Sequence, residues 1–377
     1  MTTADVHIER LKLADFRNYA ALTLDLDARH VVLTGENGAG KTNLLEAVSF
    51  LAPGRGMRRA PFDAVARADA DGSWAVNAMV QGIAGEATLG TGLQVNTATG
   101  ERSRRLQVNG AAARTFEALL EHVRIVWLTP AMDGLFAGSA GDRRRFVDRM
   151  VLAVDPGHAR RVADYERAVR GRNRLLEEYG RDEWLDAQEA QVAGLAVSVA
   201  DARRTLVDRL SQSVDAQSDA SSPFPDAVLE LDGTLERLVR DGAAADLEQE
   251  FRAELARTRP RDRAAGRTTL GPHRTDLSVR HAQKSMDARL CSTGEQKALL
   301  TGLVLAHARL VGEMSGAKPL LLLDEIAAHL DEGRRAALFD RVDAIAGQAW
   351  MTGTDASLFA AMGDRAQHLT VKDAMVS

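Results

Sequence analysis

The residues with the clearest capacity for chemistry form the run GENGAGKT, Gly35 to Thr42. This run matches the pattern G-x-x-x-x-G-K-[ST] at every defined position, and a β-branched stretch typical of a strand precedes it. Glycines let backbone N–H groups converge on a phosphate, and a helix that begins near Lys41 directs its positive end there. We expect Lys41 to reach the β- and γ-phosphates of ATP and Thr42 to bind Mg²⁺. The predicted nucleotide-binding residues are Gly35, Glu36, Asn37, Gly38, Ala39, Gly40, Lys41, Thr42 and Asn43.

Two carboxylates follow an uninterrupted run of leucines, Leu320 to Leu323. Such a run is typical of a buried strand, and Asp324 and Glu325 come directly after it. Nucleotide-binding sheets place a metal-directed aspartate and a water-polarising carboxylate at this position. We predict that Asp324 holds Mg²⁺ and that Glu325 is a general base, which contributes roughly 10²- to 10⁴-fold in rate. The alternative is an acidic pair that only ends the strand at the surface.

The turn CSTGEQKALL, Cys291 to Leu300, is a second candidate phosphate site. A Ser-x-Gly turn at the start of a helix can bind an anion through its backbone N–H groups. Because the glycine-rich loop already serves the chain's own nucleotide, we expect Ser292 and Gly294 to contact the γ-phosphate held by another copy. Asp331, in the run IAAHLD with His329, would lie along the same junction. This is the ATP-binding-cassette (ABC) arrangement, and it predicts an ATP-dependent homodimer.

Three stretches of the chain with different sequence patterns must position these residues. Residues 1–142 contain short strand-like runs and turns around the phosphate loop, and residues 261–377 show the same α/β pattern. Between them, residues 143–260 are polar and helix-forming, with an apolar residue every seven positions from Leu185 to Leu206 and another series from Leu235 to Leu255. The predicted fold class is α/β: an ABC-type P-loop ATPase head that an inserted α-helical arm splits in sequence. A helical subdomain with only a packing role is the alternative for the arm.

Arginines are concentrated at the start of this arm. Residues 143–174 contain ten arginines and four acidic residues, although the net charge of the whole chain is −5. A local basic patch suits phosphate tracking, and the scarcity of aromatic residues argues against base stacking, so we predict binding to double-stranded DNA. A solvated helix face with internal salt bridges is the alternative, and Arg144 and Arg145 could instead brace the head against the arm. The predicted DNA-binding residues are Arg143, Arg144, Arg160, Arg161, Arg170 and Arg172.

Composition excludes several classes of protein. The single cysteine, Cys291, excludes an internal disulfide framework and a cysteine-based zinc site, which suits a reducing cytoplasm. No apolar run approaches the ~20 residues of a membrane span, and no early stretch resembles a signal peptide. We therefore expect a cytoplasmic, nucleoid-associated protein without a membrane partner.

Several longer motifs together resemble the bacterial RecF family of DNA replication and repair proteins. The resemblance covers nearly the whole chain, and the spacing of GPHR and STGEQK distinguishes it from other P-loop ATPases. The motifs are FRNY (16–19), GENGAGKTNLLEA (35–47), GRGMR (54–58), GDRRRFVD (141–148), RNRLL (172–176), GPHRTDL (271–277), STGEQK (292–297) and LLLDEIAAHLD (321–331).

The resemblance implies an SMC-like ABC ATPase that hydrolyses ATP weakly with DNA stimulation. It implies an ATP-dependent homodimer that binds double-stranded DNA at gaps, acts with RecO and RecR to load RecA, maintains replication forks and supports SOS induction. It also implies that Arg17 and Asn18 contribute to the nucleotide site. Thr352 and Thr354 stand where ABC transporters place a switch histidine, and Thr352 is the predicted catalytic residue of the two; because a threonine cannot carry charge, we expect slow turnover.

Two other functions remain possible for these motifs. The chain could be the ATPase subunit of an ABC transporter, although the arm and the missing switch histidine count against this. It could also be an SMC-like head associated with a nuclease, although no further carboxylate cluster for metals is visible in the sequence.

Overall fold

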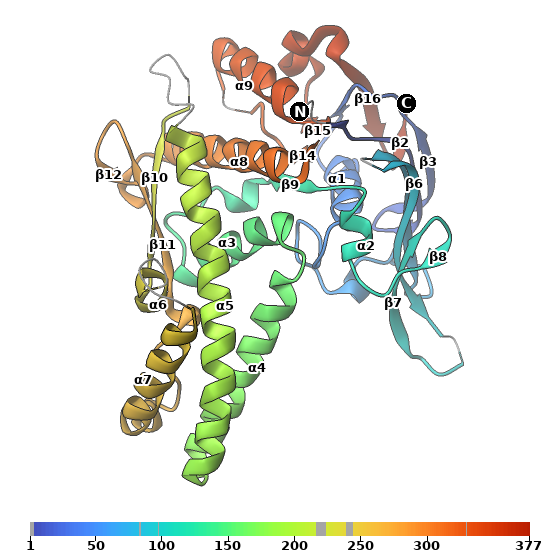
Figure 1. The fold of residues 1–377 in the computed structure, drawn as a ribbon. Helices are drawn as coiled ribbons and strands as arrows, with labels where there is room; N and C mark the ends of the chain where they lie inside the picture. Colours follow the sequence, from blue (N-terminus) through green and yellow to red (C-terminus); the bar gives the residue numbers. More distant parts are fainter. Residues whose placement is uncertain (1–3, 83, 97, 216–223, 239–243, 329) are drawn as a thin grey trace. The chain divides into compact units, whose positions relative to one another are not determined.

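The computed structural model describes residues 4–82, 84–96, 98–215, 224–238, 244–328 and 330–377 (Figure 1). The chain forms two compact units, Met1–Asp133 with Leu300–Ser377 and Gly134–Ser218 with Pro225–Leu299. The second unit extends past the predicted arm at both ends, because the strand after the GPHR motif pairs with a strand of the arm. Residues 221–223, two serines and a proline that predict a break between the two helical series, lie outside the described residues. Val239 and Ala243 of the second series and His329 lie outside them as well.

A six-stranded sheet forms the centre of the first unit, in the order β17-β16-β4-β15-β14-β9. All its pairings are parallel except that of β17 with β16. Every residue of β4, β14 and β15 is buried, as expected for a parallel sheet covered on both faces. The carboxyl ends of these three neighbouring strands therefore meet at one edge. The strands are β4 (His30–Thr34), β9 (Ile125–Leu128), β14 (Leu320–Leu323), β15 (Gln348–Gly353), β16 (Ala366–Lys372) and β17 (Met375–Val376).

A second six-stranded sheet in the same unit is antiparallel, in the order β3-β2-β5-β6-β7-β8. One face of it is buried, as the alternating exposure along β5 illustrates. Its strands are β2 (His7–Phe16), β3 (Tyr19–Asp25), β5 (Trp74–Gly82), β6 (Gly85–Val95), β7 (Arg102–Val108) and β8 (Ala111–Ala112). The remaining elements of the unit are β1 (Ala4–Asp5), which pairs with β13 (Ala317–Lys318), and the helices α2 (Glu117–Leu120) and α9 (Glu332–Ile345), with 3₁₀ turns at Phe62–Ala64, Pro130–Met132 and Ala356–Arg365.

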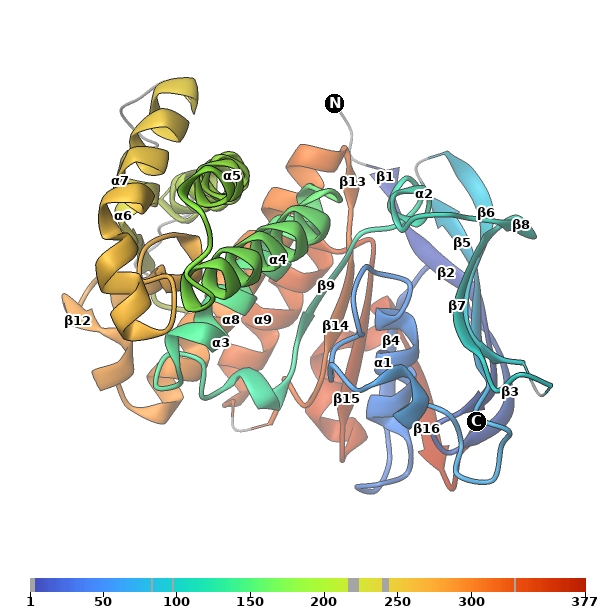
Figure 2. The same ribbon diagram turned by 90° about the horizontal axis from the view of Figure 1, so that it is seen from below.

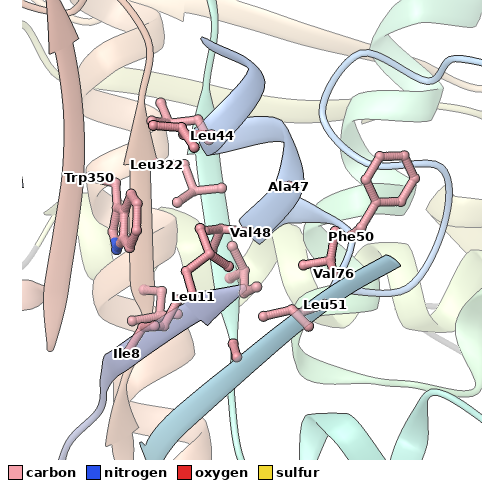
Figure 3. Packing of buried hydrophobic residues seen from close by; sticks show 14 of the residues in the cluster. Ile8, Leu11, Leu44, Ala47, Val48, Phe50, Leu51, Val76, Leu322 and Trp350 are labelled. Atoms are coloured by element: carbon pink, nitrogen blue, oxygen red, sulfur yellow. The ribbon is translucent and has the colours of Figure 1, made fainter. Parts of the chain in front are cut away.

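Helix α1 (Lys41–Ser49) lies between the two sheets (Figure 2). Leu44 and Val48 of this helix share one fully buried cluster with Trp350 and Leu322 of the parallel sheet and with Leu11 of the antiparallel sheet (Figure 3). Burying such a side chain stabilises the fold by roughly 1.5–3 kcal/mol. The helix that follows the phosphate loop is therefore held from both sides.

The second unit is mainly helical. Helices α4 and α7 both pack against the long helix α5 (Figure 1). The helices are α3 (Ala140–Val154), α4 (His158–Glu177), α5 (Asp182–Asp215), α6 (Thr234–Leu238) and α7 (Ala244–Ala265); α8 (Thr293–Ser315) starts in this unit and continues into the first. A three-stranded sheet joins them: β10 (Ala227–Asp232), β11 (Asp276–His281) and β12 (Met286–Asp287), with 3₁₀ turns at Pro272–Arg274 and Ala288–Leu290.

The apolar seven-residue spacing of the arm is confirmed. Leu185, Val192, Val199 and Leu206 lie in α5 and are buried. In the second series, Leu235 belongs to α6, and Leu247, Phe251 and Leu255 belong to α7. Helix α7 also continues through Pro260, where the sequence predicted the end of the helical arm.

Ion pairs on both sides of Pro260 explain why α7 tolerates this proline. A proline removes one backbone N–H and disfavours a helix interior. Here Arg259 pairs with Glu189 of α5, and the buried Asp262 pairs with Arg172 of α4. These contacts hold the turns on both sides of Pro260 in place.

No helix in the described part of the chain is both long and apolar enough to cross a membrane.

Candidate nucleotide-binding site

The phosphate loop connects β4 to α1 and depends on glycine at two close approaches. Gly35 has φ +145°, and a Cβ there would lie 2.1 Å from the carbonyl oxygen of Val371. Gly40 has φ +119°, and a Cβ there would lie 2.6 Å from the Tyr19 hydroxyl. Only glycine adopts this backbone in so little space. The loop therefore requires glycine at these two positions to keep this conformation.

Lys41 begins α1 and is 5% exposed. Its Nζ donates hydrogen bonds to the carbonyl oxygens of Gly35 (2.6 Å) and Glu36 (2.8 Å). Burial lowers the pKa of this ammonium, and the carboxylates of Glu325 and Asp324 act in the opposite direction. A phosphate bound in the loop would add negative charge beside the ammonium and favour its charged form.

The end of β14 is tied to the phosphate loop and to β15. Asp324 Oδ1 accepts a hydrogen bond from Thr42 Oγ1 at 2.9 Å and another from Thr352 Oγ1 at 2.8 Å. Thr352 Oγ1 in turn accepts from the backbone N–H of Glu325 at 2.9 Å. Thr352 is fully buried, so in this conformation it positions the two acidic residues. The structure thus brings together Thr42, Asp324, Glu325 and Thr352, as the sequence predicted.

Glu325 has an uncommon backbone conformation. Its φ is +52°, a left-handed value that costs a residue with a side chain on the order of 1–3 kcal/mol. The residue is exposed, whereas Asp324 is buried. Such strain persists where surrounding contacts over-determine the backbone, and the bond from Glu325 N–H to Thr352 is one of those contacts. The predicted general base is therefore fixed at its backbone and accessible at its side chain.

The FRNY motif divides into two roles. Asn18 Nδ2 donates to the Ala39 carbonyl oxygen (3.3 Å), and Asn43 Nδ2 donates to Asn18 Oδ1 (2.7 Å), so Asn18 borders the loop as expected. Arg17 instead forms two hydrogen bonds to Glu46, at 2.8 and 2.6 Å. Its third nitrogen, Nη1, donates to the carbonyl oxygen of Ala64. In this conformation Arg17 braces α1.

Sequence reasoning missed the partner of Arg17. Glu46 is fully buried on α1, and Arg58 Nη1 also donates to it at 3.0 Å and to Asn43 at 2.6 Å. A buried carboxylate is tolerated only when it is paired and hydrogen-bonded. A lone Glu inside the apolar run LLEAV was the available signal. Glu46 and Arg58 therefore connect the helix to the residues that border the loop.

The turn before α8 lies in the second unit and has its own internal partner. Ser292 Oγ and the Ser292 N–H both donate to Glu295 Oε2, at 2.8 and 2.9 Å. Glu295 N–H donates back to Ser292 Oγ at 3.4 Å, which completes a capping box. Lys284 pairs with the other oxygen of Glu295, and this pairing with the Ser292 bonds lowers the pKa of Glu295 to about 2. Asp331, in the first unit, caps α9 by accepting from the Arg334 N–H at 2.9 Å.

The prediction that Arg172 binds DNA is wrong. Arg172 is fully buried and pairs with Glu189 (3.0 Å) and Asp262 (2.7 Å). Its Nη2 donates to the carbonyl oxygen of Leu255. Because its donors are satisfied inside the unit, Arg172 cannot reach a DNA phosphate.

The other five predicted arginines differ in accessibility. Arg143 forms two hydrogen bonds to Asp276, both at 2.7 Å, and Arg144 donates to the Thr275 carbonyl oxygen at 2.7 Å. These two brace the helical unit, which matches the alternative considered for Arg144. Arg161 pairs with Asp155.

Arg160 and Arg170 are the most accessible of the set. Their side chains are 89% and 68% exposed, and their carboxylate partners lie 3.7 and 3.9 Å away. Long, exposed ion pairs contribute little to stability. These two side chains therefore remain the strongest candidates to meet a phosphate backbone.

The chain is similar to known proteins over nearly its whole length. Residues 7–377 match the model of the RecF/RecN/SMC N-terminal domain. The chain is 58% identical over 369 residues to the DNA replication and repair protein RecF of Mesorhizobium japonicum, covering 98% of this chain and 97% of that protein. It is also 58% identical over 373 residues to the RecF of Rhizobium meliloti, covering 99% of each.

Solved structures show the same fold. A structure of the recombination mediator protein RecF with ATPrS has a TM-score of 0.85 at 21% identity and covers 100% of this chain and 99% of its own. A structure of an Smc head bound to the C-terminal winged-helix domain of ScpA has a TM-score of 0.55 at 16% identity, with coverage of 98% and 96%. These likenesses confirm the predicted ABC-type head with an inserted helical unit. The chain belongs to the RecF family of DNA replication and repair proteins.

Proposed function

We propose that this protein is an ATP-dependent DNA-binding protein of recombinational repair, in which ATP binding drives homodimerisation on double-stranded DNA at gaps and slow hydrolysis releases the dimer. Family membership supports the proposal, and one observation carries it. Asp324 Oδ1 accepts hydrogen bonds from Thr42 and Thr352, so a single carboxylate connects the phosphate loop, β14 and β15. This network supports an ATPase site, because it holds a carboxylate and a hydroxyl that suit Mg²⁺ beside the phosphate loop.

The residues of this edge fit ATP and Mg²⁺. The loop N–H groups and Lys41 would bind the phosphates, and the oxygens of Thr42 and Asp324 suit a hard cation that keeps water and phosphate as its other ligands. Mg²⁺ held there would neutralise phosphate charge. Asn18 and Asn43 would then orient the loop beside the nucleotide.

The hydrolytic step depends on Glu325. Its accessible carboxylate would accept a proton from the water that attacks the γ-phosphorus, while Thr352 holds its backbone in place. The Thr352 hydroxyl is neutral and already engaged with Asp324, so it adds no positive charge at the γ-phosphate. We therefore infer a weak ATPase, stimulated when DNA favours the dimer.

The dimer would complete the site. Ser292 and Gly294 would contact the γ-phosphate held by the second subunit, and Asp331 would lie along the same junction. Apart from its chain neighbours and the backbone of its own helix, no described atom lies within 4 Å of the position that a Cβ on Gly294 would take, so the backbone at Gly294 is open to approach. ATP would thus join two subunits, and its hydrolysis would separate them.

DNA and partner proteins complete the proposal. Arg160 and Arg170, together with Arg161, would contact the phosphates of double-stranded DNA without reading its sequence. Solved relatives are described as recombination mediators in the RecFOR pathway, so we propose that RecR, with RecO, is a partner in loading RecA. Replication-fork maintenance and SOS induction, in the cytoplasm beside the nucleoid, would follow from that role.

Sedimentation with and without ATP and gapped duplex DNA tests this function. The wild-type protein should dimerise only with ATP and should bind the duplex more tightly as a dimer. Ser292→Arg should bind ATP normally yet remain monomeric, because the bulky cation blocks the turn. A wild-type protein that hydrolyses ATP at full rate as a monomer would overturn the proposal.

A further inference from the structure

The donors of Ser292 that would bind a phosphate are already occupied within the subunit. Its hydroxyl and its backbone N–H both donate to Oε2 of Glu295. The carboxylate lies in the first turn of α8, where the positive end of the helix attracts an anion. Glu295 therefore occupies the position of a bound anion in this conformation.

We propose that Glu295 is a positioning residue that competes with the γ-phosphate of a second subunit for Ser292, and that Lys284 holds the displaced carboxylate. This inference rests on the proposed function, because it assumes that the phosphate reaches Ser292 from another copy of the chain. The backbone N–H of Ser292 has one proton and cannot serve both anions at full strength. A carboxylate left beside the phosphate would also repel it.

Lys284 determines what happens to the carboxylate. The two oxygens of Glu295 have different partners, Oε2 with Ser292 and Oε1 with Lys284. Lys284 lies in the turn between β11 and β12, outside α8. Displacement from Ser292 therefore breaks the Ser292 bonds and leaves the ion pair with Lys284 intact. The ammonium also offsets the negative charge that the phosphate meets.

Capping alone does not require this charge. A capping box forms with either Glu or Gln at the third helical position, because either side chain can accept from the serine N–H. A glutamine at position 295 would keep the helix start and remove the repulsion. The charge therefore has an effect on the phosphate that the cap does not need, namely to raise the ATP concentration at which two subunits join.

Two substitutions with opposite expected signs test the inference. Glu295→Gln should lower the protein concentration at which half the chains dimerise with ATP by at least about fourfold, the effect of removing one charge about 5 Å from another even at the dielectric constant of water. Lys284→Gln should raise that concentration several-fold, since the carboxylate loses its counter-ion. ATP binding to the monomer and the melting temperature should stay unchanged in both.

Glu254→Gln is the matched control. Glu254 is a partly exposed glutamate of the same unit, with 35% of its side chain accessible, and it pairs with Arg257 three residues along α7. Its replacement should leave dimerisation unaltered, and any shift equal to that of Glu295→Gln would overturn the inference.

The outcome for wild type and Ser292→Arg separates this inference from the proposed function. If ATP dimerises the wild type, and Ser292→Arg abolishes this, but Glu295→Gln dimerises no more tightly, only the present inference fails. If ATP fails to dimerise the wild type, both fail.

Discussion

The phosphate loop before α1 and the turn before α8 each lead into a helix N-terminus that suits an anion. The two N-termini differ in whether a carboxylate of the chain already lies there. Gly40 precedes α1, and no described side chain caps that helix or places an acid in its first turn. Ser292 precedes α8, and Glu295 both caps that helix and adds a negative charge to it. The first helix start is ready for a phosphate, whereas the second must release a carboxylate first.

The same contrast extends to the cations of the two units. Lys41 in the first unit donates only to carbonyl oxygens of its own loop, so its charge is available to a ligand. Arg172 in the second unit forms ion pairs with Glu189 and Asp262, so its charge is not available to a ligand. A count of basic residues therefore does not locate a binding surface, because burial and pairing decide which charges a ligand can use.

Glu325→Gln should produce the largest effect on the first unit. The substitution removes the proton acceptor and keeps the shape, so ATP hydrolysis should fall by roughly 10²- to 10⁴-fold while ATP binding persists. Steady-state phosphate release measures the rate, and sedimentation should show a long-lived ATP-bound dimer on DNA. Glu332→Gln, on α9 of the same unit, is the control. An unchanged hydrolysis rate would remove Glu325 from the site.

Arg172→Met should have the largest effect on the second unit. The change leaves Glu189 and Asp262 buried without their cation, and breaking a buried pair in this way costs about 3–5 kcal/mol. Denaturant unfolding followed by circular dichroism measures the loss. Arg170→Met, two residues earlier and exposed, should change stability by less than about 1 kcal/mol. Equal losses for both variants would contradict the distinction between buried and available arginines.

Lys41→Met tests whether the Lys41 ammonium in the phosphate loop binds ATP. Without the ammonium, ATP affinity should fall by roughly a hundredfold, the loss of a charge-assisted bond to a phosphate. Isothermal titration calorimetry measures this directly. Lys12→Met, on the exposed side of β2 in the same unit, should leave affinity unaltered. ATP binding at wild-type strength in Lys41→Met would show that the loop does not hold the nucleotide.

Arg160→Gln combined with Arg170→Gln should give the smallest effect. If each contacts one phosphate, the slope of log affinity for duplex DNA against log salt should fall by roughly 0.9 for each residue replaced. Fluorescence anisotropy across a salt series measures the slope. Arg144→Gln, whose guanidinium already donates to Thr275, should leave the slope unchanged. A reversed pattern would assign the DNA surface to the bracing arginines.

Much of the first unit could be predicted because its signals are local. The spacing of GENGAGKT, the four leucines and the acidic pair each depend on a few consecutive residues, and the structure brings these segments to one edge of the parallel sheet. The helix through Pro260 could not be predicted in this way. Contacts with residues far along the chain, such as Arg172 with Asp262 and Arg259 with Glu189, stabilise it.

The sequence alone determined which chemistry is available: a glycine-rich loop that only glycine can form, a buried leucine strand that ends in two carboxylates, and a helical insertion between two α/β stretches. Only the tertiary structure decided where each charge acts. Arg172 meets an aspartate ninety residues away, Arg17 meets Glu46, and Ser292 meets a glutamate that Lys284 also holds. The reason is physical, since the strength of a charge depends on its burial and its partners, and the folded chain sets both.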